Sequence, residues 1–499
     1  MQGYRYLPGK QTDEQGRIST IAYDSTDGNK GNPKTISQNG QSITLNYVTG
    51  APGKLASIVN ERGKTTSYGY DAAGNLSTIT PPLPLGQTVF TYAASISRVA
   101  SVNDGKGQTR TLGYDNLDRV TSIDYAGGST LSFVYDRDGN LTAQNDSISG
   151  RNSSFTYDQL SRPTFASLAG QSSSYGYDAA SNLTSIVRGS KTTTYAYDQA
   201  NNNTSAKEPG VSTAIALGVD DNNRRTTTTY PNGVVVQRGY EQPAGRLDFI
   251  KATKGSTVLQ HESYVYAYDA EGSFSAGQGV MRIRTVDHKN NRSTRYQYDA
   301  RNRLVRARTY TTGGTVPSAS DGCYVVGALA CYEYAYDAAS NRTTRITTGY
   351  LIANTTTNFT YNDANQLLSK SGQPAGTPDY TYDANGNQLT RPTSPSALRA
   401  MAYNERDQAS PIDGVSLAYL GAGQDQPISE GSLSLRYDLL GLDERVNASS
   451  TDDYTREING TPLSQRTTTT SGSSSEYYLS DALGSITATT DSAGNLQAT

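Results

Sequence analysis

The chain is organised around short segments in which aromatic and small polar residues alternate and which end in the dipeptide Tyr-Asp. In the clearest copy, Tyr68 and Tyr70 lie two residues apart, so both point to one face of a predicted strand. Asp71 follows directly, Gly74 comes three residues later, and the aliphatic Leu76 begins a second strand. Thr and Ser fill the alternate positions, where β-branched Thr favours strands and hydroxyls favour water. The pattern predicts a β-hairpin.

This hairpin pattern recurs along the whole chain. With degenerate copies included, the spacing from Tyr47 to Tyr240 stays between 20 and 24 residues, and later copies are further apart. A self-similar period of this length is typical of repeat proteins built from one supersecondary unit. The Tyr-Asp copies start at Tyr23, Tyr70, Tyr114, Tyr135, Tyr157, Tyr177, Tyr197, Tyr268, Tyr298, Tyr336, Tyr382 and Tyr437, with Tyr-Asn variants at Tyr361 and Tyr403.

The Asp of each copy is predicted to be a turn residue and not a catalytic acid. In a type I turn, a carboxylate at this position accepts hydrogen bonds from the backbone amides that follow. The glycine three residues later suits the left-handed conformation that closes such a hairpin with a bulge. One carboxylate repeated at one turn position indicates a scaffold. The residues assigned to this structural motif are Tyr70, Asp71, Gly74, Tyr135, Asp136, Gly139, Tyr177, Asp178, Tyr298, Asp299, Tyr382, Asp383 and Gly386.

Hairpins in series bury one face only by lying beside their neighbours, which predicts a long antiparallel sheet that grows by one hairpin per repeat. Such a sheet twists and curls. Only 34% of the residues are hydrophobic and the mean hydropathy is -0.61, which leaves too few large aliphatic side chains for a filled centre. The predicted fold is therefore all-β, with tandem hairpins forming a sheet that spirals into a hollow shell or barrel-like cage. Two alternative architectures, a flat solenoid and a propeller, also consist of repeated hairpins, although the repeat is short for a four-stranded propeller blade.

Charge and composition exclude several classes of function. The 43 basic and 46 acidic residues leave a net charge of -3, so the chain lacks the basic footprint of a nucleic-acid-binding protein. The sequence has no run of about 20 apolar residues that would predict a membrane span, and the first 20 residues lack the apolar region of a signal peptide.

Cys323 and Cys331 leave two alternatives open, a disulfide in an oxidising compartment or two half-buried thiols. With His261 and His288 they form no recognisable zinc spacing, and we expect no metal or cofactor.

The repeated Tyr-Asp-x-x-Gly-Asn-Leu copies resemble the YD-repeat, or Rhs (rearrangement hot spot), family, which includes the C component of bacterial Tc toxins, wall-associated proteins and animal teneurins. The resemblance extends over residues 4–499. Near the end, two segments look like the motifs that open the core-associated segment of Rhs proteins. Their central residues are Asp443, Glu444 and Arg445 in the first motif and Asp481 and Gly484 in the second.

The resemblance implies a β-strand ribbon that spirals into a hollow shell and, in bacterial members, holds a C-terminal toxin until delivery. In that family an Asp-Pro-containing autoproteolysis motif and the toxin follow the second motif. This sequence stops at Thr499, before both, so we expect a non-enzymatic piece of a longer secreted or cell-surface polypeptide. Its expected partners are the C-terminal toxin cargo and N-terminal delivery domains. The expected segments are 1–40 (a partial repeat), 41–475 (the shell) and 476–499 (the start of the core-associated motif).

Three alternatives to the encapsulating scaffold remain at this point. An adhesion module of the teneurin or wall-associated type would bind cell-surface glycans through exposed Tyr stripes. An orphan fragment would have no function of its own. A Ser-His-Asp triad is conceivable in a Ser-rich chain, but the sequence contains no Gly-x-Ser-x-Gly elbow, and the surroundings of His288 resemble a hairpin turn.

Overall fold

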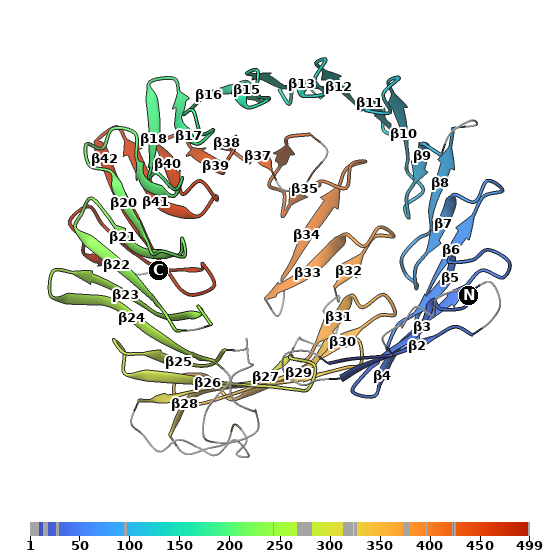
Figure 1. The fold of residues 1–499 in the computed structure, drawn as a ribbon. Helices are drawn as coiled ribbons and strands as arrows, with labels where there is room; N and C mark the ends of the chain where they lie inside the picture. The colour runs from blue at the N-terminus through green and yellow to red at the C-terminus, as the bar shows by residue number, and fades with distance from the viewer. Residues whose placement is uncertain are drawn as a thin grey trace, which may run out of the picture. The chain divides into compact units, whose positions relative to one another are not determined.

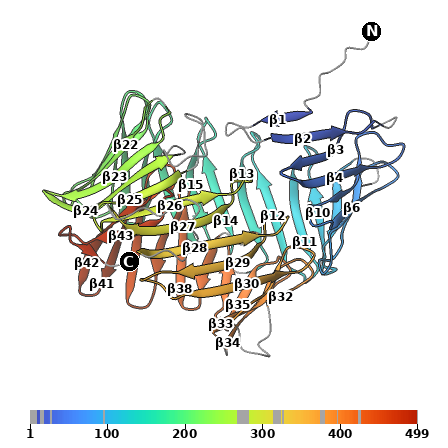
Figure 2. The same ribbon diagram turned by 90° about the horizontal axis from the view of Figure 1, so that it is seen from below.

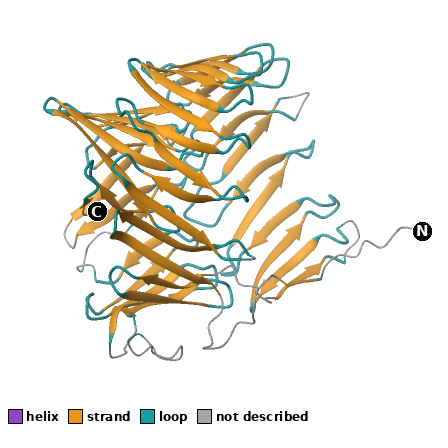
Figure 3. Ribbon diagram, turned by 60° about the vertical axis from the view of Figure 1, so that its left-hand side comes forward, coloured by secondary structure: helices purple, strands orange, loops and turns teal. Residues whose placement is uncertain are grey.

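The structure, a computed structural model, consists of strands joined by turns (Figure 3). The residues it describes contain no helix, in agreement with the predicted all-β class. The predicted repeat at Tyr268 and the N-terminal residues 1–8 lie outside the described part of the chain. The described residues are 9–12, 18–25, 29–93, 97–148, 150–242, 244–266, 282–312, 323, 327–372, 380–394, 397–421, 423 and 426–497.

The chain divides into two compact units, each assembled from separate stretches of sequence. Figure 1 labels their strands and colours them by position in the chain. The division follows packing and does not coincide with the segments 1–40, 41–475 and 476–499, which stay a prediction. Unit 1 comprises Met1–Thr111, Val265–Val286 and Asn291–Met401, and unit 2 comprises Leu112–Tyr264, Asp287–Asn290 and Ala402–Thr499.

In unit 1, each strand pairs antiparallel with its neighbour in the chain from β1 to β10, again from β26 to β31, and from β32 to β34. Figure 2 shows β26 to β30 side by side. The first stretch contains β1 (Lys10–Thr12), β2 (Ile18–Tyr23), β3 (Pro33–Gln38), β4 (Gln41–Tyr47), β5 (Leu55–Val59), β6 (Thr65–Tyr70), β7 (Leu76–Thr80), β8 (Thr88–Tyr92), β9 (Val99–Asn103) and β10 (Thr109–Tyr114). The later stretches contain β25 (Arg282–Asp287), β26 (Arg292–Tyr298), β27 (Leu304–Thr311), β28 (Ala328–Tyr336), β29 (Arg342–Thr348), β30 (Thr355–Tyr361), β31 (Leu367–Lys370), β32 (Thr381–Tyr382), β33 (Gln388–Ser394) and β34 (Ala397–Tyr403).

Unit 2 contains two such ladders, one from β11 to β24 and one of nine strands from β36 to β44. The first ladder consists of β11 (Val120–Tyr125), β12 (Thr130–Tyr135), β13 (Leu141–Asp146), β14 (Ser153–Tyr157), β15 (Pro163–Leu168), β16 (Gln171–Tyr177), β17 (Leu183–Arg188), β18 (Lys191–Tyr197), β19 (Asn203–Lys207), β20 (Ile215–Val219), β21 (Arg225–Thr229), β22 (Val234–Tyr240), β23 (Leu247–Lys254) and β24 (Thr257–Tyr266). After β35 (Ala409–Ile412), the second consists of β36 (Leu417–Tyr419), β37 (Pro427–Glu430), β38 (Leu433–Asp438), β39 (Gly441–Val446), β40 (Ser450–Arg456), β41 (Pro462–Thr469), β42 (Gly472–Ser480), β43 (Ile486–Thr490) and β44 (Leu496–Gln497).

The hairpins have the geometry that the repeat predicts. In the β6–β7 hairpin, Tyr68 lies opposite Ile79 and Tyr70 lies opposite Leu76, so the return strand starts at the predicted aliphatic residue. The register shifts between Gly69 and Tyr70, which is the bulge expected from a left-handed glycine in the turn. The long antiparallel sheet is thus confirmed, and its closure into a shell stays a prediction.

The apolar core is concentrated in unit 2. The largest side chains that are almost completely buried include Leu131, Ile186, Ile215, Ile250 and Leu479, all from its two ladders. The second ladder packs against the first, as at Tyr230 and Tyr477, and so supplies the second layer that a hydrophobic core requires.

Candidate functional site

The Tyr-Asp turns are built around one carboxylate. Asp71 Oδ1 accepts a hydrogen bond from the backbone N–H of Asn75 at 2.8 Å, and Oδ2 accepts one from the Asn75 side chain at 3.0 Å. The backbone closes the same turn, since the N–H of Gly74 donates to Asp71 O at 2.9 Å. The same carboxylate-to-amide bond recurs at Asp136, Asp178, Asp299 and Asp383, in the turns that follow Tyr135, Tyr177, Tyr298 and Tyr382.

These carboxylates are ionised acceptors. The side-chain hydrogen bond from Asn75 holds the pKa of Asp71 below its ordinary value, and Asn140 and Asn182 do the same for Asp136 and Asp178. A group held in its ionised form by bonds within its own turn has no proton to donate to a substrate. The turn geometry therefore supports a structural role for the repeated Asp.

The residue three positions after the Asp has a positive φ. Gly74, Gly139 and Gly386 have φ values of 88°, 90° and 93°. Ser181 and Asn302 occupy the same position in other turns, with φ values of 70° and 61°. Glycine adopts this backbone conformation without a steric penalty, which explains why it is frequent there.

The repeat tyrosine ties each hairpin to the preceding one. The hydroxyl of Tyr70 donates to Leu55 O at 2.9 Å, and Tyr135, Tyr177 and Tyr382 make the corresponding bonds to Val120 O, Pro163 O and Leu367 O. In each case the acceptor belongs to the first residue or two of the return strand one repeat earlier. The rings are half-buried, so Tyr uses its apolar face for packing and its hydroxyl for the backbone.

A cation from one turn covers the tyrosine of the next. Arg162 stacks on the ring of Tyr177 with 4.8 Å from Cζ to the ring centroid, and its Nη1 donates to Asp178 O at 3.2 Å. Its Nε also donates to its own turn carboxylate, Asp158, at 2.7 Å. Arg119 over Tyr135, Arg224 over Tyr240, Arg303 over Tyr336 and Lys54 over Tyr70 repeat the stacking.

Sequence reasoning missed this inter-repeat clamp, although the sequence contains its signal. The residue four positions after the turn Asp is Asn or Arg in most copies, as in Asn75, Arg119 and Arg162. The Asn and Arg side chains both donate to the carboxylate of their own turn. Of the two, only the longer Arg guanidinium also reaches the tyrosine ring of the next repeat. The position therefore carries a contact between neighbouring repeats where it is Arg.

The predicted motif residues Asp443, Glu444 and Arg445 lie on β39, where Asp443 and Glu444 form part of a buried charge cluster. Asp443 is 4% exposed, and its Oδ2 lies 2.5 Å from Nη1 of Arg188. Glu444 Oε1 lies 2.5 Å from Nζ of Lys191. Arg445 is exposed and stands apart from the cluster. Both cations come from the β17–β18 hairpin, more than 250 residues away in sequence.

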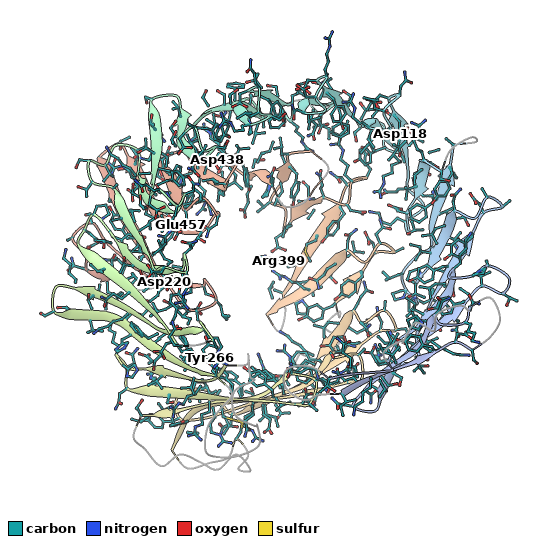
Figure 4. All side chains as sticks on the ribbon, viewed as in Figure 1. Asp118, Asp220, Tyr266, Arg399, Asp438 and Glu457 are labelled. Atoms are coloured by element: carbon teal, nitrogen blue, oxygen red, sulfur yellow. A yellow bond between two sulfur atoms is a disulfide. The ribbon has the colours of Figure 1, made fainter. Side chains whose placement is uncertain are left out.

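Two further carboxylates and one further cation complete this cluster. Asp453 on β40 accepts from Lys191 at 2.6 Å, and Arg436 on β38 donates to Glu444 Oε2 at 2.5 Å. Asp438, labelled in Figure 4, lies beside Asp443. Four carboxylates thus meet three cations inside unit 2.

Burial, neighbouring charges and hydrogen bonds shift the pKa values of the carboxyl groups in this cluster in different directions. Burial, reinforced by the charge of Asp438, raises the pKa of Asp443 to about 8. Burial also raises the pKa of Asp453. For Glu444 burial has the same tendency, but hydrogen bonds from Lys191 and the charges of Lys191 and Arg436 lower its pKa overall. With Asp443 protonated, the cluster is electrically balanced.

The second predicted motif forms an ordinary repeat turn. Asp481 Oδ1 accepts from the N–H groups of Leu483 and Ser485 at 2.8 and 3.0 Å, and Gly484 has a φ of 81°. These are the contacts of the Asp71 and Gly74 turn, so the motif supplies one more hairpin and no separate site.

The cysteines and histidines also have defined positions. Cys323 and Cys331 are joined by a disulfide in unit 1. His288 lies in a turn, as expected, with its ring stacked on that of His261 at 4.2 Å between centroids. Its Nε2 lies 2.9 Å from Ser263 Oγ, but the carboxylate of the adjacent Asp287 bonds to Asn290. Among the described residues, Ser263 and His288 are therefore in contact, while the acid next to His288 in the sequence is bonded to Asn290.

The described ranges hold no group of three His, Cys, Asp or Glu side chains placed to bind a metal ion. They also hold no helix that is long and apolar enough to cross a membrane.

Comparison with known proteins points to one repeat family and one fold. The RHS Repeat family profile matches residues 53–88 and 97–130. No curated protein matches the chain. The crystal structure of TcdB2-TccC3 matches with a TM-score of 0.61 and 14% identity, over 97% of this chain and 31% of that chain.

Two related structures give the same result. The crystal structure of TcdB2-TccC3 without its hypervariable C-terminal region has a TM-score of 0.62 at 14% identity, over 97% of this chain and 30% of that chain. The Tc holotoxin pore of Photorhabdus luminescens, with a mutation in TccC3, has a TM-score of 0.55 at 14% identity and the same coverages.

At 14% identity, the structural likeness shows the fold, and the chain spans less than a third of the length of the structures it matches. The repeat profile and the fold are independent observations, and both agree with the turn ladder described above. Residues 53–88 and 97–130 thus carry the RHS Repeat, and the chain has the β fold of the TcdB2-TccC3 structures.

Proposed function

We propose that this chain is a non-catalytic part of the wall of an RHS-type bacterial toxin shell. Its cargo is a C-terminal toxin and its delivery depends on N-terminal domains, both in parts of the polypeptide beyond residues 1–499. One observation carries the proposal: the polar groups of the repeat turns bond within their own turn, as Arg162 does to Asp158, or to the adjacent repeat, as Arg162 does to Asp178 O and Tyr177 to Pro163 O. Polar groups that bond to one another hold the sheet together, which is what the wall of a shell requires.

The comparisons and the disulfide give additional support. One matching structure is described as lacking a hypervariable C-terminal region, which is the place where the proposal puts the cargo. Disulfides persist in oxidising compartments, so the Cys323–Cys331 bond supports a secreted or cell-surface location.

The adhesion alternative requires ring faces that a sugar can stack on. The faces of Tyr70, Tyr135 and Tyr177 are instead covered by Lys54, Arg119 and Arg162. This occupancy favours the wall, and reproducible glycan-array binding that is lost on substitution of Tyr pairs would favour adhesion.

Small-angle X-ray scattering of the purified chain tests the wall. A filled globule of this length has a radius of gyration of about 23 Å. A wall around an internal volume has its mass further from the centre, so we expect a clearly larger radius and a pair-distance distribution with a maximum shifted to long distances. A radius near the filled value, or the profile of a flat extended rod, would contradict encapsulation.

A further inference from the structure

The side chain of Lys191 is held between two carboxylates from a distant part of the sequence. Its Nζ lies 2.6 Å from Asp453 Oδ1 and 2.5 Å from Glu444 Oε1. Lys191 begins β18, whereas Glu444 and Asp453 lie opposite each other on β39 and β40. The contact therefore joins the two ladders of unit 2.

This environment differs from that of an ordinary surface ion pair. The side chains of Asp453 and Glu444 are 4% and 6% exposed, and that of Lys191 is 33% exposed. Lys64 and Asp363 in unit 1 also form a close pair, at 2.8 Å, but their side chains are 34% and 51% exposed. Water solvates the Lys64 pair and is largely excluded from the carboxylates around Lys191. An amine beside a buried carboxyl group and a second buried carboxylate are the components of an amide-forming reaction.

We propose that Lys191 and Asp453 join through an intramolecular amide (isopeptide) bond, with Glu444 as the proton carrier. The reaction needs no oxidant, cofactor or external reactant. It consumes one ammonium and one carboxylate, so the charge balance of the cluster is preserved.

Formation of the amide conserves atoms and protons. The ammonium of Lys191 passes one proton to Asp453 across their direct contact, which gives a free amine and a carboxylic acid. The nitrogen lone pair attacks Cγ of Asp453, and a second nitrogen proton moves to Glu444 Oε1. Glu444 returns this proton to the hydroxyl on Cγ, the Cγ–O bond breaks with its electron pair on oxygen, and water leaves. The last nitrogen proton remains as the amide N–H, and Glu444 ends ionised.

The surrounding groups favour this division of roles. Burial raises the pKa of Asp453, which favours its neutral acid form as the electrophile. Glu444 also accepts from Arg436, and its pKa is lowered, so it is available as the base. Arg188 is occupied by Asp443 at 2.5 Å, and its Nη1 lies further from Glu444 and Asp453, at 3.8 and 3.6 Å.

Confinement and burial supply the driving force that free amines and carboxylates lack in water. Well-oriented groups react with effective concentrations on the order of 10⁵ M or more. Forming the amide also removes a largely buried ion pair, whose desolvation is costly. The product would fasten β18 to β40 covalently across 262 positions of the sequence. This inference stands independently of the proposed toxin-shell function.

Mass spectrometry of the full 499-residue chain, denatured and reduced so that the Cys323–Cys331 disulfide is opened, tests the proposal after purification and again after prolonged incubation. We expect an intact mass one water below the sequence mass. Trypsin should then release residues 189–207, uncut after Lys191, joined to residues 446–456, and fragmentation should place the bond between Lys191 and Asp453. Cyclisation at Asp-Gly pairs also loses water, so the joined peptide is the decisive product.

Two variants serve as controls. Lys191→Arg keeps the positive charge but cannot form the amide, so its mass should equal its sequence mass. Glu444→Gln keeps the side-chain size and removes the base, so the rate of bond formation should fall about 100-fold or more. A native chain of unchanged mass, or a water loss that Lys191→Arg retains, would overturn the proposal. Unchanged kinetics in Glu444→Gln would overturn the role of Glu444.

Discussion

Units 1 and 2 are built from the same hairpin, yet their separate stretches of sequence are held together differently. In unit 1 the stretches meet at turns: Arg62 Nη1 donates to Asn362 O at 2.7 Å, and Arg301 pairs with Glu61 at 2.9 Å. In unit 2 they meet face to face. There Tyr230 packs on Tyr477 with 5.1 Å between ring centroids, beside side chains such as Leu479 that are fully buried.

The difference shows what the repeat does and does not supply. The Tyr-Asp turn and its cation clamp hold each hairpin to the next in both units. A second layer, with its apolar core and buried ion pairs, exists where the C-terminal ladder covers the first one. We infer that unit 2 is the more stable unit and that unit 1 depends mainly on contacts between neighbouring repeats.

The largest expected effect comes from the buried pair between Arg406 and Asp146 in unit 2. Their side chains are 1% and 0% exposed, and the two guanidinium nitrogens lie 2.7 and 2.9 Å from the carboxylate oxygens. Arg406→Ala leaves an unpaired buried charge and should lower the free energy of unfolding by about 3–5 kcal/mol. Urea unfolding followed by circular dichroism measures this loss.

Arg62→Ala in unit 1 is the matched control for that substitution. Arg62 pairs with Asp337 at 3.4 Å, but both side chains are about one-fifth exposed. Water can replace the lost contacts, so we expect a loss of about 1 kcal/mol. Equal losses in the two variants would remove the distinction between the units.

The next effect is a pH dependence that belongs to unit 2. The pKa of Asp443 is raised to about 8 in the folded chain, whereas an unfolded Asp titrates near its ordinary value. The folded state therefore binds more protons, and the stability from this group is present at low pH and lost as pH rises toward about 8.

Asp443→Asn removes this titration. Between about pH 5 and about pH 8, the wild-type chain should lose roughly 3–4 kcal/mol of unfolding free energy that the variant does not lose. The midpoints of urea unfolding, measured across this pH range, test the prediction. If the midpoints of the two chains change in parallel with pH, Asp443 is not neutral in the folded chain.

The smallest effect is local and should be similar in either unit, because it concerns the turn. Gly74→Val forces a β-branched residue into a φ of 88° and places its side chain against Lys54, which should cost about 1 kcal/mol or more. Thermal melting provides the measurement, with Gly139→Val as the corresponding change in unit 2. An unchanged melting curve would argue against the strain assigned to this turn.

Much of the fold could be predicted because the hairpin is a local structure. The alternation at Tyr68 and Tyr70, the Asp71 turn and the return at Leu76 all act within a dozen residues, and each has a mechanism that does not depend on distant parts of the chain. The clamp was equally local, and Arg162 could have been assigned to it from the recurring position four residues after Asp158.

The buried cluster could not be predicted in the same way. Asp443 and Glu444 were singled out by resemblance, but their partners Arg188 and Lys191 lie in an unremarkable hairpin turn. No periodicity in the sequence relates residues that are more than 250 positions apart. The disulfide between Cys323 and Cys331 is an intermediate case, since the close spacing allowed it and only the fold brought the two sulfurs together.

The sequence by itself therefore determined the repeat: its strands, its turns, its Tyr hydroxyl bonds and the direction in which the sheet grows. These features follow from alternation and turn chemistry, which are short-range. The tertiary structure decided which repeats gain a second layer, and hence which carboxylates are stripped of water. Burial changes the chemistry of a carboxyl group, so Asp71 stays an ionised turn acceptor while Asp443 and Asp453 shift toward their neutral acids.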